Sequence, residues 1–310
     1  MFGIGRKIKK KYLIIIIKFL KKIISKNIYS LILFLSAYKK FKKEINKNKT
    51  KNLYSSNLDK INYYEFKITS QNNEDGILDY IFTKVPNKKF FIEIGFDFFE
   101  CNSLNLIKNG WNGVLIEADE EKCIKAEKCI RHFYPKNKVK VINAKIDKDN
   151  INDFVNYEKI DFFSIDIDGN DYWVLEKLKT KNINIICSEY NPWIGNKTFK
   201  TIPYNKNFLY MNDYYFGASL NAYVEMFDKK EFSLIAVDSS GTNAFYANSS
   251  LSNKFEILVP EKSYKEATKF HSKSEQLEIK DYIEKKEFIN LKKIFNNRKI
   301  INFFLFKSIY

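Results

Sequence analysis

Two apolar runs in the middle of the chain, at 162–167 and 183–187, end in acidic and amide side chains. These side chains are Asp166 and Asp168 at the first run, and Glu189 and Asn191 after the second. A helix-length segment, 172–181, separates the runs, which predicts a strand, a helix and a second strand. Because open α/β sheets bind ligands at the carboxyl ends of their strands, the sequence predicts an active site here.

The acidic and amide oxygens of this site suit two kinds of chemistry. Oxygen ligands from two strand ends fit Mg²⁺, which can bind a substrate hydroxyl and acidify it. The predicted metal ligands are Asp166, Asp168, Glu189 and Asn191. Alternatively, Asp168 acts as a general base without a metal, and the predicted catalytic residues are Asp168, Glu189 and Asn191. Asn170 and Asp171 fit equally well as further ligands or as turn and cap residues.

A second acidic pattern follows two earlier predicted strands, at 89–94 and 113–116. Gly95 directly follows the first strand and lets the backbone approach a ligand closely. Glu117, 22 residues after Gly95, could accept hydrogen bonds from both hydroxyls of a ribose. Sites for dinucleotides and for S-adenosylmethionine both use such an acid.

The loop after Gly95 favours a cationic methyl donor over a nicotinamide cofactor. It lacks the further glycines of a GxGxxG loop, and Asp97 and Glu100 would repel a pyrophosphate. Carboxylates at Glu93, Asp97 and Asp166 would instead attract the sulfonium and ammonium groups of S-adenosylmethionine. We therefore expect a methyl-donor site rather than an oxidoreductase site.

Strands that alternate with helices must position these residues. Helical spacing or capping patterns occur at 71–82, 102–108, 120–132 and 172–181, and strand patterns at 89–94, 113–116, 139–146, 162–167 and 183–187. Two further strands, at 232–237 and 244–247, flank a turn and predict an antiparallel hairpin. The pattern predicts a doubly wound, Rossmann-like α/β sheet. The expected divisions are an arm and linker at 1–60, the α/β domain at 61–255 and a helical extension at 256–310.

Six segments between Ser70 and Leu251 carry a resemblance to a known family. They are SQNNEDGILDYIF, FFIEIGFDFFECNSLNLIKNGWNGVLIEAD, DFFSIDIDGNDYWVLEKL, IICSEYNPWIG, YFGASLNAYVEMF and SSGTNAFYANSSL. In this order they resemble the FkbM-like branch of class I S-adenosylmethionine-dependent methyltransferases, and SIDIDGNDYW and SEYN are the most specific motifs. The resemblance implies a seven-stranded sheet and O-methylation of a hydroxyl on a surface-glycan sugar or a secondary metabolite.

The same resemblance implies roles for particular residues. Glu93, Gly95 and Glu117 would hold the donor, with Asn143 and Lys145 near its adenine. Tyr215, Gly217 and Ser219 would lie near the acceptor. One departure is the pair Phe98-Phe99, where the family usually has a glycine near position 98. This departure supports an alternative function, a catalytically inactive binding module of the same fold in a glycan pathway.

The excess positive charge lies in the first sixty residues. The chain of 310 residues carries a formal charge of +16, and 17 basic against 2 acidic residues give +15 within 1–60, which leaves about +1 for the rest. A groove that follows a phosphate backbone would spread this charge over the fold, so we expect no nucleic acid partner. The four cysteines lack metal-site spacing, which favours reduced thiols in a cytoplasmic protein.

The arm contains an apolar stretch, 12–37, that lysines interrupt. These lysines, Lys18, Lys21, Lys22 and Lys26, fall on one face of a helix. Because each would cost roughly 2.5–3.5 kcal/mol near a bilayer centre, a membrane span is not expected. Two alternatives stay open: a basic amphipathic helix at the inner face of the membrane, or a helix packed on the body with its lysines in water.

Overall fold

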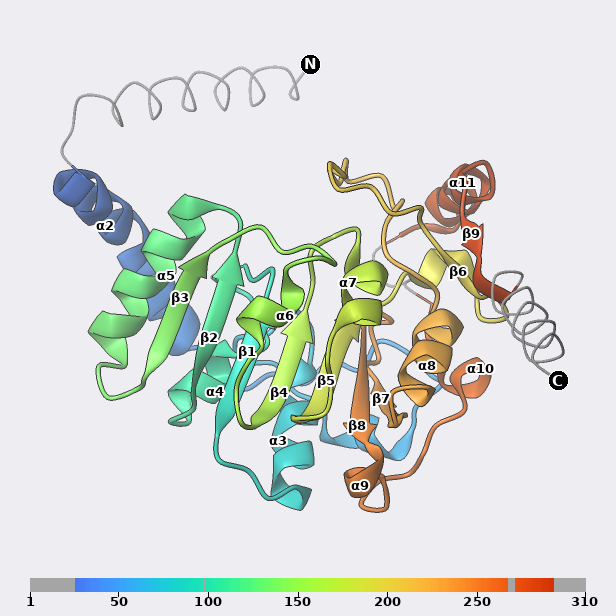
Figure 1. Ribbon diagram of the computed structural model, residues 1–310, viewed down its shortest axis with the longest axis horizontal. Helices are drawn as coiled ribbons and strands as arrows, with labels where there is room; N and C mark the ends of the chain where they lie inside the picture. Colours follow the sequence, from blue (N-terminus) through green and yellow to red (C-terminus); the bar gives the residue numbers. More distant parts are fainter. Residues whose placement is uncertain (1–25, 98, 267–270, 293–310) are drawn as a thin grey trace, which may run out of the picture.

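A seven-stranded mixed sheet forms the centre of the molecule (Figure 1). The computed structural model describes residues 26–97, 99–266 and 271–292. The strands follow the order β3-β2-β1-β4-β5-β8-β7, and within this sheet β8 runs opposite to the other six strands. Their bounds are β1 Phe90–Ile94, β2 Asn112–Glu117, β3 Val139–Asn143, β4 Ile160–Ile165, β5 Ile183–Glu189, β7 Phe232–Val237 and β8 Asn243–Asn248. The predicted Rossmann-like sheet and its terminal hairpin are confirmed.

The register of the parallel strands brings the predicted site residues to one edge. Ile94 of β1 pairs with Ile116 of β2 on one side and with Ile165 of β4 on the other, and Ile165 pairs with Ser188 of β5. The residues that follow these strands therefore share the carboxyl edge of the sheet. The chain order reverses between β1 and β4, which is the point where such sheets bind ligands.

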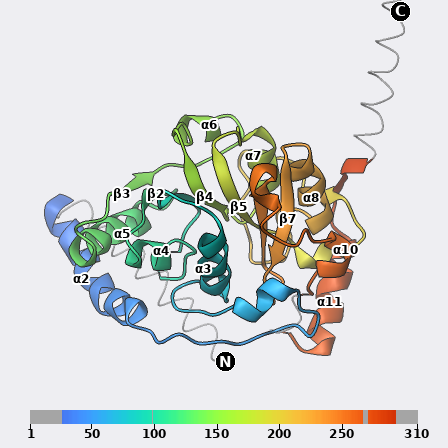
Figure 2. The ribbon, with the colours of Figure 1, turned by 90° about the horizontal axis from the view of Figure 1, so that it is seen from below.

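Helices cover both faces of the sheet, as Figure 2 shows. One face carries α3 (Glu74–Lys84), α4 (Leu104–Lys108) and α5 (Glu120–Phe133), and the other carries α6 (Ile151–Phe154), α7 (Asp171–Lys177) and α8 (Leu220–Asp228). Neighbouring residues of β4 point to opposite faces, so that Phe162 packs in the core under α3 to α5 and Phe163 in the core under α6 to α8. Both rings are fully buried. Burial on both faces explains why the strands read as continuous apolar runs.

Shorter elements complete the described chain. They are α2 (Lys26–Ile45), η1 (Lys60–Tyr64), η2 (Pro192–Ile194), β6 (Lys200–Thr201), α9 (Ser249–Ser252), α10 (Pro260–Ser263), α11 (Lys273–Glu284) and β9 (Ile289–Asn290). β6 and β9 form a separate two-stranded sheet. Within the described ranges, no helix combines the length and apolar character needed to cross a membrane.

Three boundaries differ from the sequence predictions. α2 continues to Ile45, beyond the apolar stretch 12–37 of the predicted arm, because Phe41 and Ile45 are buried against the body. β3 ends at Asn143, where Ala144 N donates to Glu117 O. α7 ends at Lys177, because Leu178 adopts an extended backbone. The predicted helical stretch 12–25 lies outside the described residues.

A buried ion pair joins the N-terminal and C-terminal segments. Lys265 Nζ lies 2.7 Å from Asp59 Oδ2, and the lysine side chain is fully buried. Ser263 Oγ donates to the other oxygen of Asp59 over 3.1 Å, and Tyr190 Oη donates to Lys265 O over 2.9 Å. These bonds attach both segments to the end of β5. The division of the chain at 60 and 256 stays a prediction.

Candidate active site at the carboxyl edge of the sheet

Gly95 allows the loops after β1 and β4 to touch. Its φ is +77°, and a Cβ at this position would lie 1.6 Å from Asp166 O. Asp166 N also donates to Ile94 O over 2.9 Å. No side chain fits between the two backbones, so glycine is required here by space as well as by conformation.

The turn between β4 and α7 is organised by Asp171. Its Oδ1 accepts from Ile167 N and its Oδ2 accepts from Gly169 N, both over 2.9 Å. Within this turn Asp168 has a φ of +53°, a left-handed conformation that aspartate tolerates better than most residues. Asn170 donates from Nδ2 to Asn205 O over 2.7 Å. Asp171 and Asn170 therefore hold the turn, which favours the structural role among the two that the sequence left open.

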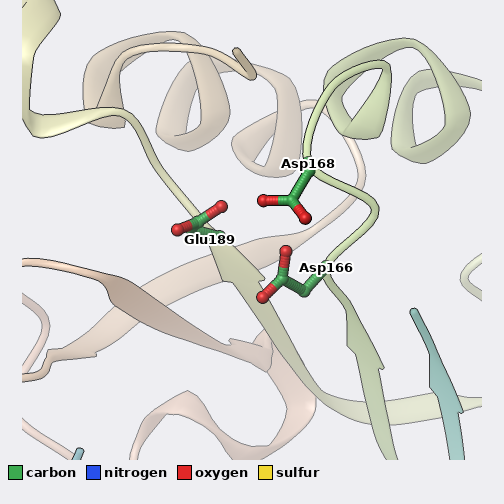
Figure 3. Close-up of side chains that lie close together, drawn as sticks. All are labelled: Asp166, Asp168 and Glu189. Carbon is green, nitrogen blue, oxygen red and sulfur yellow. The ribbon is translucent and has the colours of Figure 1, made fainter. Parts of the chain in front are cut away.

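Three carboxylates meet at this edge, as Figure 3 shows. One oxygen from each of Asp166, Asp168 and Glu189 lies within 4.8 Å of the other two. Asp166 Oδ1 is buried and has no hydrogen-bond partner. Asp168 is the most exposed member of this carboxylate cluster, and Asp166 and Glu189 are partly buried.

The cluster is electrostatically unfavourable when all three groups are ionised. Burial, followed by the charges of Asp168 and Asp171, raises the pKa of Asp166 well above its ordinary value. Burial and the charges of Asp166 and Asp168 do the same to the pKa of Glu189. The pKa of Asp168 is also raised, by burial first, and Lys122 opposes this shift. Protons or a hard cation would relieve the repulsion, and an all-oxygen donor set with one unpartnered oxygen fits Mg²⁺ or Ca²⁺.

The side chain of Asn191 is bonded to backbone groups of the protein. Its Oδ1 accepts from Trp193 N over 2.9 Å, where it caps η2. Its Nδ2 donates to Tyr214 O over 2.8 Å and to Phe216 O over 3.0 Å. The side chain is buried and uses its donors and its acceptor within the frame of the site. The roles of Asn191 as a metal ligand and as a catalytic residue stay predictions, and these bonds favour a structural role instead.

A cavity of about 220 Å³ lies over the ends of β1, β2 and β4. Ile116, Ile146 and Phe208 give it apolar walls, and Glu117 and Lys145 supply charged groups. The Glu117 carboxylate accepts from Asp119 N over 2.9 Å, and Lys145 Nζ donates to Lys206 O over 3.1 Å. We call this space the donor cavity, after the methyl donor that the sequence predicts at Glu117.

Asn143 supports the donor cavity without lining it. Its Nδ2 donates to Glu117 O over 3.0 Å and to Ala118 O over 2.9 Å. It thereby ties the end of β3 to the loop after β2. The predicted contact of Asn143 with a cofactor stays a prediction, and its position fits an indirect effect through Glu117.

A second cavity, of about 320 Å³, lies beside the first and contains the carboxylate cluster. We call it the acidic cavity. Its polar lining residues are Gln71, Glu93, Asp97, Glu100, Asn102, Lys122, Asp166, Asp168, Glu189 and Asn243. The two cavities share Gly95, Lys122, Asp166 and Asp168. A ligand in the donor cavity would therefore lie next to any molecule held by the cluster.

Glu93 and Asp97 line the acidic cavity but have partners within the protein. Glu93 accepts from Asn102 N over 3.0 Å and from Ser103 N over 2.9 Å, just before α4 begins. Burial raises the pKa of Glu93, and these hydrogen bonds oppose the shift. Asp97 Oδ1 accepts from Phe99 N over 2.9 Å. Phe98, where the family usually has a glycine, lies outside the described residues.

Several lining residues were not predicted to be functional, and Lys122, Phe208, Asn243 and Gln71 are examples. Lys122 is one of many charged residues of α5, and Phe208 lies in a loop without a regular pattern. Asn243 pairs with Glu189 across β8 and β5, a register that the sequence of the hairpin alone could not supply. Gln71 belongs to the first segment of the family resemblance, which was the one signal that could have identified it.

Comparison with known proteins does not assign the chain to a family. No family model matches the chain, and no curated protein matches it in sequence. Similar solved structures include a S-adenosylmethionine-dependent methyltransferase from Clostridium acetobutylicum, at 11% identity over 56% of this chain and 90% of that chain, with a TM-score of 0.38. Another is magnesium protoporphyrin IX methyltransferase from Synechocystis with bound SAH, at 10% identity over 72% of this chain and 99% of that chain, with a TM-score of 0.41.

A third similar structure is a methyltransferase from Geobacter sulfurreducens, at 14% identity over 58% of this chain and 81% of that chain, with a TM-score of 0.38. At these identities and TM-scores the three structures establish neither a family nor an activity for this chain. Its fold class rests on its own strand order, which is that of Rossmann-like methyltransferase sheets.

Proposed function

We propose that the chain is an S-adenosylmethionine-dependent O-methyltransferase of the FkbM-like type. The observation that carries this proposal is the pair of joined cavities. One offers a carboxylate and apolar walls, and the other offers a cluster of carboxylates, with Asp166 and Asp168 lining both. Such a pair suits a nucleoside-bearing methyl donor beside a hydroxyl acceptor.

The donor cavity would hold the nucleoside of S-adenosylmethionine. Glu117 would accept from the ribose hydroxyls, and Ile116, Ile146 and Phe208 would pack against the adenine. Gly95 leaves its backbone open to the ligand. The bound donor supplies an electrophilic methyl group on a positively charged sulfur, and the nearby carboxylate of Asp166 would stabilise that charge.

The carboxylate cluster would prepare the acceptor. As the acceptor oxygen forms its bond to the methyl carbon, the electron pair of the carbon–sulfur bond goes to sulfur and the hydroxyl proton has to leave. Asp168, the most exposed carboxylate of the three, would receive this proton on a carboxylate oxygen. If Mg²⁺ is held by Asp166, Asp168 and Glu189, it would supply a Lewis acid that lowers the pKa of a hydroxyl.

The lining of the acidic cavity supports a hydroxyl-rich small molecule or glycan as the acceptor. Gln71 and Asn243 contribute amides beside the carboxylates, and Phe96 supplies an aromatic surface among the lining residues. Amide and carboxylate groups can each bond to several hydroxyls, whereas a flat apolar acceptor would need a more apolar wall.

A catalytically inactive binding module is the second candidate. The observation in its favour is the loop after Gly95, which lacks a second glycine and in which Asp97 and Glu100 form an isolated β-bridge. This function predicts donor binding without formation of S-adenosylhomocysteine. A methyltransferase function predicts both donor binding and formation of S-adenosylhomocysteine once a hydroxyl acceptor is supplied.

Donor binding can be tested by titration calorimetry of S-adenosylmethionine into the full chain. We expect micromolar binding by the wild type. The affinity of Glu117→Ala should be at least about tenfold lower, because one good pair of hydrogen bonds to a charged group disappears. The affinity of Glu284→Ala should not change. Glu284 is an exposed acid on α11 and serves as the matched control. Equal affinities for the wild type and Glu117→Ala would contradict the assignment of the donor cavity.

A further inference from the structure

The helix α2 exposes an apolar face to solvent. Ile28, Leu31, Ile32 and Leu35 are between 45% and 60% exposed. Their spacing of three and four residues places them on one side of the helix. The opposite side, with Tyr29, Leu33, Ala37 and Phe41, is buried. A helix that only packed on the body would present polar residues to water on its outer side.

The inner side of α2 is fixed to the body. Tyr29 Oη donates to Glu121 of α5 over 2.5 Å. Phe41 packs against Phe133, the last residue of α5, with ring centroids 5.3 Å apart. The apolar face, defined as Ile28, Leu31, Ile32 and Leu35, therefore cannot turn inward without breaking these contacts.

The charge of α2 identifies the kind of surface that would cover its apolar face. The helix exposes Lys26, Lys39, Lys40, Lys42 and Lys43, and its only acid, Glu44, is buried. Lys39, Lys42 and Lys43 continue the line of the apolar face along the later turns. An apolar surface beside exposed lysines matches anionic lipid headgroups above their acyl chains.

The same charges disfavour the two other occupants. A second copy of the chain would bring its own α2 lysines against these lysines. Residues 1–25 carry eight lysines and arginines and no acid, so folding them over α2 would also join like charges. An anionic bilayer offers both negatively charged headgroups for the lysines and an apolar interior for the apolar face.

We propose that the apolar face of α2 docks on the surface of an anionic lipid bilayer. This inference goes beyond the proposed function and does not depend on it. In Figure 1 the N-terminal half of α2 lies at the level of the carboxyl ends of the strands. Docking through this half would bring the edge of the sheet that carries the two cavities close to the headgroups.

Vesicle flotation of the full chain tests the proposal. The variant replaces Ile28, Leu31, Ile32 and Leu35 by glutamine, which preserves helix propensity. The matched control replaces Leu53, Ile257, Val259 and Leu277, which are 37% to 69% exposed elsewhere, by the same residue. Vesicles of phosphatidylcholine with 30% phosphatidylglycerol are compared with pure phosphatidylcholine, and melting temperatures verify folding.

The wild type and the control should float with the anionic vesicles and not with the neutral ones. The α2 variant should bind at least about tenfold more weakly, since binding scales with buried apolar area. Three results would overturn the proposal: no flotation of the wild type, equal flotation of the α2 variant, or a wild-type dimer without lipid that the α2 variant dissociates.

A fluorescent label reports what covers the face. The four native cysteines are buried, so Leu31→Cys can be labelled selectively with a nitrobenzoxadiazole group. We expect emission typical of water in buffer and a blue shift only when anionic vesicles are added. A blue-shifted spectrum without vesicles would mean that the chain covers its own face, and the proposal would fail.

Discussion

At the scale of single residues, Gly95 decides whether the two cavities can exist. The donor and acidic cavities share this residue, and its Cα hydrogen faces Asp166 O at a distance that excludes a methyl group. Most of the site residues were placed correctly at the carboxyl edge by the sequence, because strand ends can be recognised from apolar runs. Their partners could not be recognised, because a pattern of residue types does not show that Asp171 bonds to Ile167 N and Gly169 N, or Asn191 to Trp193 N, rather than to a ligand.

Gly95→Ala should destabilise the protein far more than Gly110→Ala. Both glycines have positive φ, at 77° and 83°, but a Cβ at Gly110 meets no atom within 4 Å. For Gly110→Ala we expect the free energy of unfolding to fall by about 1 kcal/mol, from backbone conformation alone. For Gly95→Ala the clash with Asp166 O raises the expected loss to about 3 kcal/mol or more. Urea unfolding measures both, and equal losses would show that the two loops do not touch.

The carboxylate cluster predicts opposite effects of Asp166→Asn with and without a metal. In EDTA at pH 8 the variant should be more stable than the wild type by about 1 kcal/mol or more, because it removes one of three repelling charges. Saturating Mg²⁺ or Ca²⁺ should raise the melting temperature of the wild type and not that of the variant.

Asp228→Asn is the control for this pair of measurements, since Asp228 is exposed at the end of α8. It should respond to the metal as the wild type does. If the metal stabilises Asp166→Asn as much as the wild type, the cluster does not bind it.

At the scale of elements, the sequence predicted whether a segment is a helix or a strand better than it predicted where the segment begins and ends. Every strand of the main sheet was expected from its sequence pattern. In β1, β4 and β5, burial on both faces leaves little room for polar residues, whereas the edge strand β3 is partly exposed. The end of β3 and the length of α2 were missed. The first depends on a bond to the end of β2, and the second on packing of Phe41 against Phe133 of α5. Such long-range contacts leave no periodic signal in the chain.

The ion pair between Asp59 and Lys265 should hold the terminal segments to the sheet. Asp59→Ala leaves a fully buried ammonium without its carboxylate, and we expect the free energy of unfolding to fall by about 3 kcal/mol or more. Lys60→Ala breaks the adjacent pair with Glu256, whose side chains are 87% and 55% exposed, and should cost less than about 0.5 kcal/mol. Thermal unfolding compares the two. A small loss for Asp59→Ala would mean that the segments pack independently of this pair.

At the scale of the whole molecule, buried acids make stability depend on pH. Asp238 is fully buried, and burial followed by the charges of Glu74 and Glu65 raises its pKa well above the ordinary value. A carboxyl whose pKa is higher in the folded state stabilises the fold below its unfolded pKa of about 3.9, and this contribution is lost as the pH rises through the folded pKa.

The melting temperature of the wild type should therefore fall between pH 5 and pH 8, and less steeply in Asp238→Asn. The asparagine keeps an acceptor for Thr242 N and Asn243 N and can donate to Ser240 Oγ. Asp228→Asn again serves as the control and should keep the wild-type slope. A slope that Asp238→Asn leaves unchanged would contradict the assignment of this acid.

The central claim is that S-adenosylmethionine binds over the ends of β1, β2 and β4. The most direct measurement is a crystal structure of the full chain with S-adenosylhomocysteine. We expect the ribose hydroxyls on Glu117, the adenine between Ile116, Ile146 and Phe208, and the sulfur facing the carboxylate cluster. A ligand bound elsewhere, or a donor cavity that stays empty at saturating ligand, would contradict the account.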